Sequence, residues 1–195
     1  MTSITAHSQP LDNNMTGDLP ILVSDMTSLR HLYLGDNYLF GSIPTKCSHF
    51  PSLQYVAVFD NKIAGAIPPE IGNLSILQQL YIGYYNTFSD GIPSEIGNLS
   101  QLVRFDGASC GLFGAIPKEI SNRQNLDILF LQVNAFARVL TAELSYLKSL
   151  KSMDLSNNMF SGEIPTSFAQ LKNLTLLNLF RNKLHGSIPK FISNL

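Results

Sequence analysis

Apolar and polar positions recur along this chain with a period of about 24 residues. The marker of each unit is a polar slot, which recurs at a constant spacing except for one extra residue before Asn86. This slot is filled by Asn13, Asn37, Asn61, Asn86, Cys110, Asn134, Asn158 and Asn182. An apolar residue stands three positions before most of these residues, and another stands two positions earlier. Such alternation is typical of a strand with one buried face. The unit L-x-x-L-x-L-x-x-N therefore predicts one short strand in each repeat.

The spacing places these strands along the whole chain. We expect roughly seven parallel strands, with cores at Leu32–Leu34, Val56–Val58, Leu80–Ile82, Phe105–Gly107, Leu129–Leu131, Met153–Leu155 and Leu177–Leu179. The apolar pair of the 25-residue unit, Leu80 and Ile82, is displaced by one position because of the extra residue before Asn86. The variable positions between the apolar residues are predicted to face solvent.

The second half of each unit reads G-x-I-P. Glycine lies four residues after the polar slot, where a turn with positive φ disfavours other residues, at Gly17, Gly41, Gly65, Gly114, Gly162 and Gly186. The proline two or three positions later lacks a donor, which suits a short second strand at an edge. Pairs three residues apart, such as Ile71 and Leu74, then predict short helical or 3₁₀ turns that point inward.

No single unit buries its own apolar face, so the units must stack on one another. The predicted fold is an α/β repeat solenoid, a right-handed curved superhelix with a parallel β-sheet on its concave face. The solenoid is expected to span residues 11–195 in about seven to eight repeats, uncapped at both ends. Residues 1–10 are expected to be an unstructured or incomplete N-terminal segment.

The recurring asparagine has a structural role in this scheme. A side-chain amide carries donors and an acceptor, so a column of stacked asparagines can satisfy backbone groups at the turn that ends each strand. Some units depart from the pattern. Arg138 stands in a glycine slot, Asp90 takes another with Gly91 one place late, and Arg123 replaces an outer-face leucine. A side chain forced to positive φ costs about 1 kcal/mol.

Composition narrows the class of partner. The 195 residues are 45% hydrophobic and 14% charged with a net charge of -1, which permits a large core and provides no basic patch. Nucleic acids and anionic membranes are therefore not expected partners. Apolar runs are far shorter than the roughly 20 residues that a bilayer span needs, so no direct membrane insertion is expected. Residues 1–10 also lack the pattern of a secretory signal.

Candidate chemistry is sparse. The four histidines, His7, His31, His49 and His185, have no metal-ligand spacing. The chain has no G-x-x-x-x-G-K loop, no kinase H-R-D or D-F-G element and no nucleophile elbow. We therefore assign no catalytic residue, metal or cofactor. Cys47 and Cys110 lie more than two repeats apart in different slots, beyond the roughly 7 Å that a disulfide allows between Cα atoms, and are predicted to be free thiols.

The exposed strand positions carry the sharper functional signal. Large aromatic groups exposed together on one face usually mark an interaction surface. The predicted ligand-binding residues are Tyr55, Phe59, Tyr81, Tyr84, Tyr85, Arg104, Asp106, Phe130, Gln132 and Asp154. The extra residue before Asn86 makes Tyr84 and Tyr85 a local bulge that re-aims one ring into the groove. The alternative is that the rings only shield the strand backbone between repeats.

Four N-x-S/T sequons predict N-glycosylation in a secreted protein. They begin at Asn14, Asn73, Asn98 and Asn173. Three of the four fall within an N-L-S/T stretch on the outer side of the repeat, so they can equally be repeat consensus residues.

The I-P-x-E-I-G-N-L-S units resemble the plant-specific repeat of leucine-rich-repeat receptor-like kinases over nearly the whole chain, from about Leu11 to Leu195. Stretches that resemble the CLAVATA and Barely Any Meristem branch are Tyr81–Asn86, Leu129–Asn134, Leu150–Phe160 and Leu174–Leu184. The resemblance implies binding of short secreted CLE peptides on the concave face, a leucine-rich-repeat co-receptor and a location on the extracellular side of the plasma membrane. It also implies a signal peptide, N-terminal cap, transmembrane helix and Ser/Thr kinase in intact members, and none of these is expected within residues 1–195.

The family is expected to read the carboxylate of the peptide with paired arginines on one strand, whereas Arg181 stands alone here. This segment is therefore expected to contact the upstream and middle parts of the peptide. Two other interpretations stay open. One is a secreted enzyme inhibitor of the polygalacturonase-inhibitor type, which shares this repeat. The other is a truncated gene product without independent activity.

Overall fold

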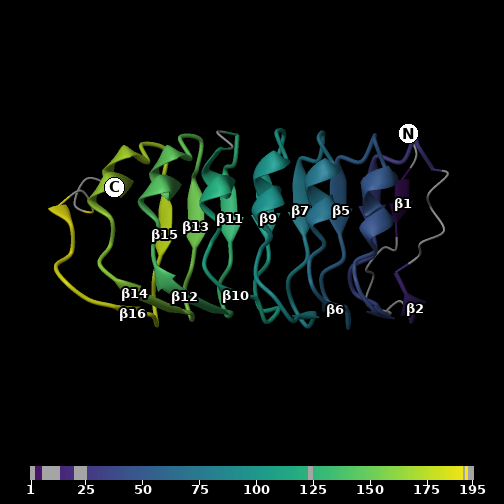
Figure 1. The fold of residues 1–195 in the computed structure, drawn as a ribbon, viewed down its shortest axis with the longest axis horizontal. Helices are drawn as coiled ribbons and strands as arrows, with labels where there is room; N and C mark the ends of the chain where they lie inside the picture. Colours follow the sequence, from purple (N-terminus) through teal and green to yellow (C-terminus); the bar gives the residue numbers. More distant parts are fainter. Residues whose placement is uncertain (1–2, 6–13, 20–25, 123–124, 191, 193–195) are drawn as a thin grey trace.

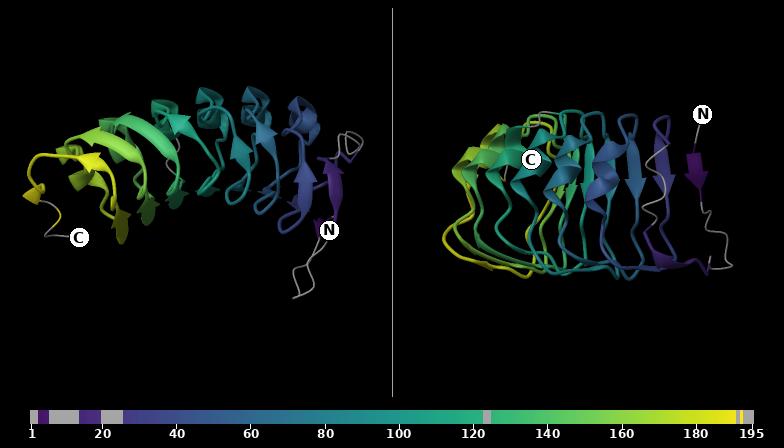
Figure 2. Two further views of the ribbon diagram at one scale, coloured as in Figure 1. Left: turned by 90° about the horizontal axis from the view of Figure 1, so that it is seen from below. Right: turned by 45° about the vertical axis from the view of Figure 1, so that its right-hand side comes forward.

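The protein is an arc of stacked coils, and each coil adds one strand to a continuous parallel sheet. The structure is a computed structural model that describes residues 3–5, 14–19, 26–122, 125–190 and 192. In this part of the chain, eight strands follow one another in the order β1-β3-β5-β7-β9-β11-β13-β15, on the inner side of the arc (Figure 2). Their bounds are β1 Ser3–Thr5, β3 His31–Tyr33, β5 Tyr55–Ala57, β7 Gln79–Tyr81, β9 Arg104–Asp106, β11 Ile128–Phe130, β13 Ser152–Asp154 and β15 Leu176–Asn178.

A second set of strands runs along one lateral edge of the arc (Figure 1). They form the parallel sheets β2-β4, β6-β8 and β10-β12-β14-β16. Their bounds are β2 Thr16–Asp18, β4 Tyr38–Phe40, β6 Ala64–Gly65, β8 Thr87–Phe88, β10 Phe113–Gly114, β12 Ala135–Val139, β14 Met159–Gly162 and β16 Lys183–Leu184. The predicted short second strand of each G-x-I-P half thus precedes its proline.

Short 3₁₀ helices occupy the outer side of the arc (Figure 2). They are η2 Thr45–His49, η3 Pro69–Asn73, η4 Ser94–Asn98, η5 Lys118–Asn122, η6 Ala142–Tyr146 and η7 Thr166–Gln170. Their apolar residues point inward, as the three-residue interval predicted, and Ile71 and Leu74 are both 2% exposed. In η6, the Thr141 side chain caps the helix by accepting a hydrogen bond from the Glu143 backbone N–H, where other units have proline.

The strand predictions are correct in place and off by one residue in their bounds. Each predicted core starts on an apolar residue, whereas each observed strand starts one residue earlier. The reason is visible in the hydrogen bonds that open the ladder. The backbone N–H groups of Gln54 and Tyr55 both donate to the Arg30 carbonyl, 2.8 and 3.0 Å away, so pairing begins before the apolar residue Val56.

The N-terminal segment differs from the prediction. Residues 1–10 were expected to be unstructured or incomplete, but Ser3–Thr5 form β1, which pairs in parallel with β3. Ile4 pairs with Leu32, whereas Leu32 pairs with Val56, so the first interval is longer than the repeat period. A search for that period therefore misses this strand, although the Ser-Ile-Thr alternation is that of the other strands.

The core is one continuous apolar column between the inner sheet and the outer helices. Each coil contributes the inward residues of its strand and of its 3₁₀ helix. In the coil of β7, for example, Leu77, Leu80 and Ile82 are completely buried. At about 25 cal/mol per Å² of buried apolar surface, this stacking is the main stabilising contribution, and it exists only between neighbouring coils.

The asparagine column satisfies the backbone as predicted. The Asn61 amide donates to the carbonyls of Val58 and Phe59 in its own turn and to the Leu34 carbonyl of the preceding coil, at 2.9 to 3.2 Å. Its Oδ1 accepts from the Leu39 backbone N–H of that preceding coil at 2.9 Å. Asn61 is only 1% exposed, and buried backbone groups without a partner are costly. The column therefore joins adjacent coils where water is excluded.

Cys110 takes the asparagine slot without an amide. Its thiol donates to the Gly107 carbonyl at 3.0 Å. In other coils an asparagine Oδ1 accepts a backbone N–H of the preceding coil, but here the Phe88 N–H donates to the Cys110 backbone carbonyl at 2.8 Å. The Ile82 carbonyl is meanwhile reached by the Asn86 amide at 2.9 Å. The coil that follows the 25-residue unit thus needs no side-chain amide of its own, because its backbone carbonyl and the Asn86 amide of the preceding coil satisfy these groups.

The backbone conformations confirm the glycine prediction and add a second rule. All six glycines of the G-x-I-P slots have positive φ, and Arg138, which replaces one, has φ of 85°. Asp90 and Gly91 are not among the described residues with positive φ. A further left-handed position, which sequence reasoning missed, is the residue before each polar slot, found at Asp36, Asp60, Tyr85, Ser109, Val133, Asn157 and Arg181. In the 25-residue unit Tyr84 is left-handed as well.

Candidate functional site

The concave face carries a row of rings in contact on three successive strands. It is formed by His31, Tyr33, Tyr55 and Tyr81 and is called here the aromatic row. The ring centroids of Tyr33 and Tyr55 are 4.3 Å apart, and those of Tyr55 and Tyr81 are 5.3 Å apart. His31 meets Tyr33 and Tyr55 edge-on. These rings are half-buried. Adjacent parallel strands lie about 4.8 Å apart. Tyr55 is paired with His31, whereas Tyr33 and Tyr81 are level with Ala57, so the three tyrosines meet diagonally across β3, β5 and β7.

Arg104 on β9 extends the aromatic row with a positive charge. It hydrogen-bonds Tyr81, which raises the pKa of its guanidinium, and the Tyr81 hydroxyl donates to Gln79 Oε1 at 2.9 Å. Arg104 Nε also lies 3.7 Å from Asp127 Oδ1, a buried oxygen that accepts no hydrogen bond. Burial, with smaller contributions from the neighbouring tyrosines, raises the pKa of Tyr55 to about 12. The tyrosine therefore stays neutral at physiological pH.

A cluster of polar residues follows further along the same face. It consists of Asp106, Gln132 and Asp154 and is called here the polar group. Gln132 Nε2 donates weakly to the Tyr84 hydroxyl at 3.5 Å, and Gln132 Oε1 is buried without a hydrogen-bond partner. Burial raises the pKa of Asp106, whose Oδ1 accepts from the Ala108 N–H at 3.0 Å. Asp154 accepts from the Ser156 N–H and from the Asn178 amide, both at 2.9 Å. These residues offer mainly acceptors to a ligand.

The predicted phenylalanines, Phe59 and Phe130, do not belong to the aromatic row and have different surroundings from the tyrosines. Phe59 lies flat against Gly35 of the preceding coil, since a Cβ built on that glycine would be 2.8 Å from its Cζ. For Phe59 the shielding interpretation therefore describes at least part of its role. Phe130 on β11 is half-buried between Asp106 and Asp154 of the adjacent strands. Phe180, which is not among the predicted binding residues, is 62% exposed and has the Arg181 guanidinium 5.1 Å from its ring centre.

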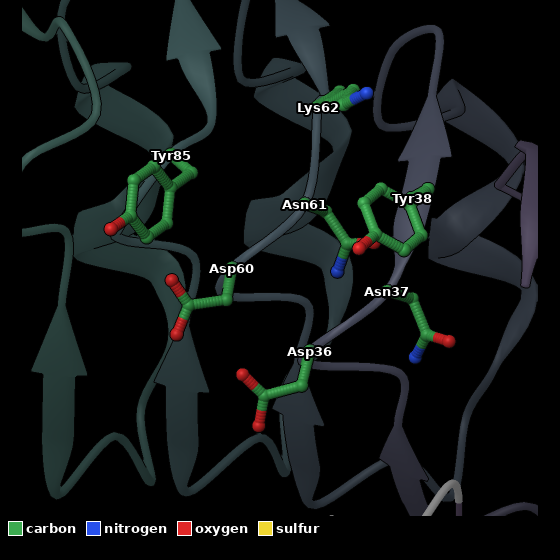
Figure 3. A pocket seen from close by; sticks show the side chains of 7 residues that line it. All are labelled: Asp36, Asn37, Tyr38, Asp60, Asn61, Lys62 and Tyr85. Atoms are coloured by element: carbon green, nitrogen blue, oxygen red, sulfur yellow. The ribbon is translucent and has the colours of Figure 1, made fainter. Parts of the chain in front are cut away.

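A cavity of about 530 Å³ opens where the inner sheet turns toward the lateral strands, and is called here the lateral cavity. Its lining comes from the turns that follow β3, β5 and β7 and from the first residue of β4. The lining residues are Asp36, Asn37, Tyr38, Asp60, Asn61, Lys62 and Tyr85. Figure 3 shows Asp60 between Tyr85 and Asp36, with the two carboxylates on the same side of the chain. Tyr85 is 80% exposed.

The two carboxylates of the lateral cavity interact with each other. Burial raises the pKa of Asp60, and the charge of Asp36 and a hydrogen bond with it raise the pKa further. Lys62 Nζ lies 5.1 Å from the centre of the Tyr38 ring. Among the described residues, neither carboxylate has a Lys, Arg or His nitrogen within ion-pair distance. No ion pair in the described part of the chain therefore neutralises these two carboxylates.

The structure places six of the predicted binding residues on strands of the concave sheet, namely Tyr55, Tyr81, Arg104, Asp106, Phe130 and Asp154. It divides the predicted residues into separate groups, which the sequence did not indicate. Tyr55, Tyr81 and Arg104 form one contact group, and Tyr84 with Gln132 forms another. Tyr85 belongs instead to the lateral cavity, whose acidic residues Asp36 and Asp60 were missed. The signal that could have found them is an aspartate in the position before the slot asparagine in two successive repeats, because equivalent positions stack.

Other predicted sites are placed as follows. Cys110 is a free, buried thiol, and burial raises its pKa to about 12. The side chain of Cys47 lies outside the described ones, and so does Arg123. The four sequon asparagines are exposed, and the Asn173 amide donates to the Lys148 carbonyl at 2.8 Å. Within the described residues, no group of three His, Cys, Asp or Glu side chains could hold a metal ion, and no helix is long and apolar enough to cross a bilayer.

Comparison with known proteins shows which fold has this geometry. Residues 121–184 and 28–50 each match a family described as leucine rich repeat. The crystal structure of a TDR receptor superposes with a TM-score of 0.92 and 42% identity, over 94% of this chain and 32% of that chain. The chain is a leucine-rich-repeat solenoid. Its parallel concave sheet matches the ectodomain structures of plant leucine-rich-repeat receptors.

Two further solved structures are complexes. The leucine-rich-repeat chain is 34% identical to the plant peptide hormone receptor RGFR1 in complex with RGF2, over 93% of this chain and 29% of that chain, with a TM-score of 0.90. It is 29% identical to the Arabidopsis receptor kinase HAESA in complex with the peptide hormone IDA and the co-receptor SERK1, over 98% of this chain and 32% of that chain, with a TM-score of 0.88. The chain spans about a third of the length of these proteins.

Proposed function

We propose that the leucine-rich-repeat chain is the ligand-binding part of a plant receptor-kinase ectodomain and binds an extended secreted peptide on its concave face. The observation that carries the proposal is the aromatic row, which is continued by Arg104 on β9, the strand next to β7. Strands recur about every 4.8 Å, so successive side chains of an extended ligand can meet successive strands. The similarity to RGFR1 and HAESA, solved with their peptide hormones, supports the same use of the fold.

The residues proposed to contact the peptide are those of the aromatic row from Tyr55 onward and of the polar group. Aromatic side chains and arginine supply a large share of the energy at binding interfaces. The face also offers acceptors, the carboxylate oxygens of Asp106 and Asp154, to the backbone N–H groups of the peptide. Tyr84 and Phe130 lie among these groups.

At finer detail, we propose a CLE-type peptide, in line with the sequence resemblance to the CLAVATA and Barely Any Meristem branch. A leucine-rich-repeat co-receptor and a location on the extracellular side of the plasma membrane are parts of the same proposal. The complex of HAESA with SERK1 supports a co-receptor of this kind. Glycans on Asn14, Asn73, Asn98 and Asn173 are proposed for the secreted protein, and the exposure of all four supports them.

The proposal is tested by calorimetric titration of the chain with synthetic CLE-type peptides. The variants Tyr81→Ala and Phe130→Ala are expected to lose about 1 to 2 kcal/mol of binding free energy each, roughly a factor of 5 to 30 in Kd. Tyr146→Ala is the matched control, because Tyr146 is 56% exposed on η6, on the opposite side of the arc. Unchanged affinity in folded Tyr81→Ala and Phe130→Ala would show that the rings shield the backbone only.

A further inference from the structure

The lateral cavity has the chemistry of a second ligand subsite, next to the aromatic row and distinct from it. We propose that this cavity binds a cationic side chain, a guanidinium or ammonium group, of the peptide. The inference rests on the proposed function, since it assigns one contact of the peptide. It adds a requirement on the ligand that the aromatic row alone does not impose.

The walls of the lateral cavity suit a cation. Asp36 and Asp60 provide two carboxylates on one side, and neither is neutralised by an ion pair in the described part of the chain. Tyr85 stands beside Asp60 (Figure 3) and is exposed enough to place its ring over a bound group. Cations are attracted both to carboxylates and to the faces of tyrosine rings within about 6 Å. A bidentate guanidinium satisfies the geometry of paired acceptors well.

Lys62, the cationic residue among those that line the cavity, already contacts an aromatic ring. Lys62 Nζ lies 5.1 Å from the centre of the Tyr38 ring, and Figure 3 shows Lys62 at the opposite end of the lining from Asp36. Burial, the charge of Asp36 and a hydrogen bond with Asp36 all raise the pKa of Asp60. When both groups are ionised, the two carboxylates repel each other. A bound guanidinium or ammonium group would replace this repulsion with attraction. An anionic or purely apolar group would gain nothing here.

The extra residue of the 25-residue repeat connects the cavity with the concave face. Tyr84 and Tyr85 both have left-handed φ, of 53° and 54°, in the turn between β7 and β8. Tyr85 lines the lateral cavity, whereas Tyr84 contacts Gln132 of the polar group. The charge of Asp60 acts on Tyr84 and raises the pKa of its hydroxyl, after burial and Asp106. A peptide on the concave face can therefore reach the cavity with one long side chain.

The first experiment tests the cavity without any peptide. N-acetyl-arginine amide is titrated into the isotope-labelled chain and followed by NMR, with N-acetyl-citrulline amide as the neutral isostere. Saturable shifts of the Asp36, Asp60 and Tyr85 backbone amides are expected with the arginine probe alone. They are expected to vanish in the variant Asp36→Asn/Asp60→Asn. Asparagine is chosen because both aspartates have left-handed φ, of 55° and 50°, which asparagine tolerates.

Asp18→Asn is the matched control, because Asp18 is an exposed carboxylate on β2 outside the lateral cavity. It should leave the shifts produced by the arginine probe unchanged. Equal shifts with arginine and citrulline, or arginine shifts that persist in Asp36→Asn/Asp60→Asn, would overturn the assignment of the cavity. Shifts that fail to appear with either probe would overturn it as well.

The second experiment places the cavity in peptide recognition. A CLE-type peptide with arginine at one position is compared with its citrulline analogue, position by position, by calorimetry. At one position, replacing arginine by citrulline is expected to weaken binding of the peptide to the wild-type chain by about tenfold or more. The same replacement is expected to have no effect on binding to Asp36→Asn/Asp60→Asn. Peptide binding without any arginine preference would leave the proposed function standing and refute the cavity. Binding of the arginine probe without binding of any peptide would refute the proposed function and leave the cavity as a cation site.

Discussion

The coils of β5 and β7 differ by one residue, and this difference separates what the fold requires from what it tolerates. The strands of the two coils pair without a gap, Val56 with Leu80 and Ala57 with Tyr81. Asn61 and Asn86 both remain in the buried column. The extra residue is absorbed between Ile82 and Asn86, where the chain leaves the core. The core and the ladder set the register, and the turn accepts additional length.

The extra residue has a cost in backbone conformation and changes which side chains lie at the surface. The regular coil has one left-handed residue before its asparagine, Asp60, whereas the longer coil has two, Tyr84 and Tyr85. A side chain in this conformation costs on the order of 1 kcal/mol. As a result, Tyr84 contacts Gln132 of the polar group and Tyr85 lines the lateral cavity. This departure from the repeat therefore lies at residues proposed to contact the ligand, as is typical of functional sites on repeat scaffolds.

The largest expected effect concerns the core, where the two kinds of coil should be equivalent. Leu80 in the longer coil and Leu129 in a regular coil are both completely buried. Leu80→Ala and Leu129→Ala are each expected to lower the free energy of unfolding by about 2 to 5 kcal/mol. Urea denaturation followed by circular dichroism gives both values. A loss below about 1 kcal/mol for Leu80→Ala alone would mean that the longer coil is loosely packed and that the comparison fails.

The next effect concerns the asparagine column. Asn61→Ala and Asn86→Ala each leave a buried backbone N–H, of Leu39 or Ile63, without its acceptor, as well as carbonyls of the turn. Unfolding free energies should fall by about 1 to 3 kcal/mol in both variants. Asn125→Ala serves as the control, since this exposed amide makes one long hydrogen bond to the Ser100 carbonyl at 3.4 Å. An Asn86→Ala variant as stable as the control would show that the longer coil does not use the column.

Most of the fold could be predicted from the sequence because the repeat imposes the same physical demand at every unit. Burial fixes the apolar slots, the unpaired backbone of the turn fixes Asn61 and its equivalents, and positive φ fixes the glycines. The strand β1 was missed because its interval to β3 is longer than the repeat period. The left-handed position before each asparagine was missed because residues as different as Asp60 and Val133 occupy it.

The candidate site was less predictable. Alternation along a strand shows which side chains leave the core, so Tyr55 and Tyr81 could be assigned to the concave face. It does not show how far a ring leans over its neighbour, and this is why the packing of Phe59 on Gly35 was not foreseen. Nor does it show that Asp36 meets Asp60 across two coils. Such contacts depend on the twist and curvature of the stack, which the pattern of single residues does not encode.

A smaller effect is expected where a regular coil lacks its glycine. Arg138 has φ of 85° in a slot that other coils fill with glycine. Arg138→Gly should therefore raise the free energy of unfolding by about 1 kcal/mol, measured as an increased urea midpoint. Lys183→Gly is the control, because Lys183 lies in β16 without positive φ and its replacement should cost about 0.5 to 1 kcal/mol. A loss of stability in both variants would show that the Arg138 side chain contributes more than its conformation costs.

The smallest effect concerns the coil after the insertion, in which a thiol replaces the amide. Burial raises the pKa of Cys110 from an ordinary value of 9.0 to about 12. Above its unfolded pKa, the unfolded chain has lost this proton while the folded chain still holds it. The stabilising contribution of the neutral thiol is thus complete below pH 9.0 and is lost progressively as the pH rises toward about 12.

Wild type and Cys110→Ala can be compared by urea midpoints between a pH of about 8 and a pH of about 11. The wild-type midpoint is expected to fall more steeply with pH than that of Cys110→Ala. The variant should keep a residual slope above pH 10.0 because burial also raises the pKa of Tyr55 to about 12, and adding Tyr55→Phe should reduce that slope further. Parallel curves for wild type and Cys110→Ala would mean that the thiol ionises in the folded protein as easily as in the unfolded one. The coil after the insertion would then be open to water, unlike its regular neighbours.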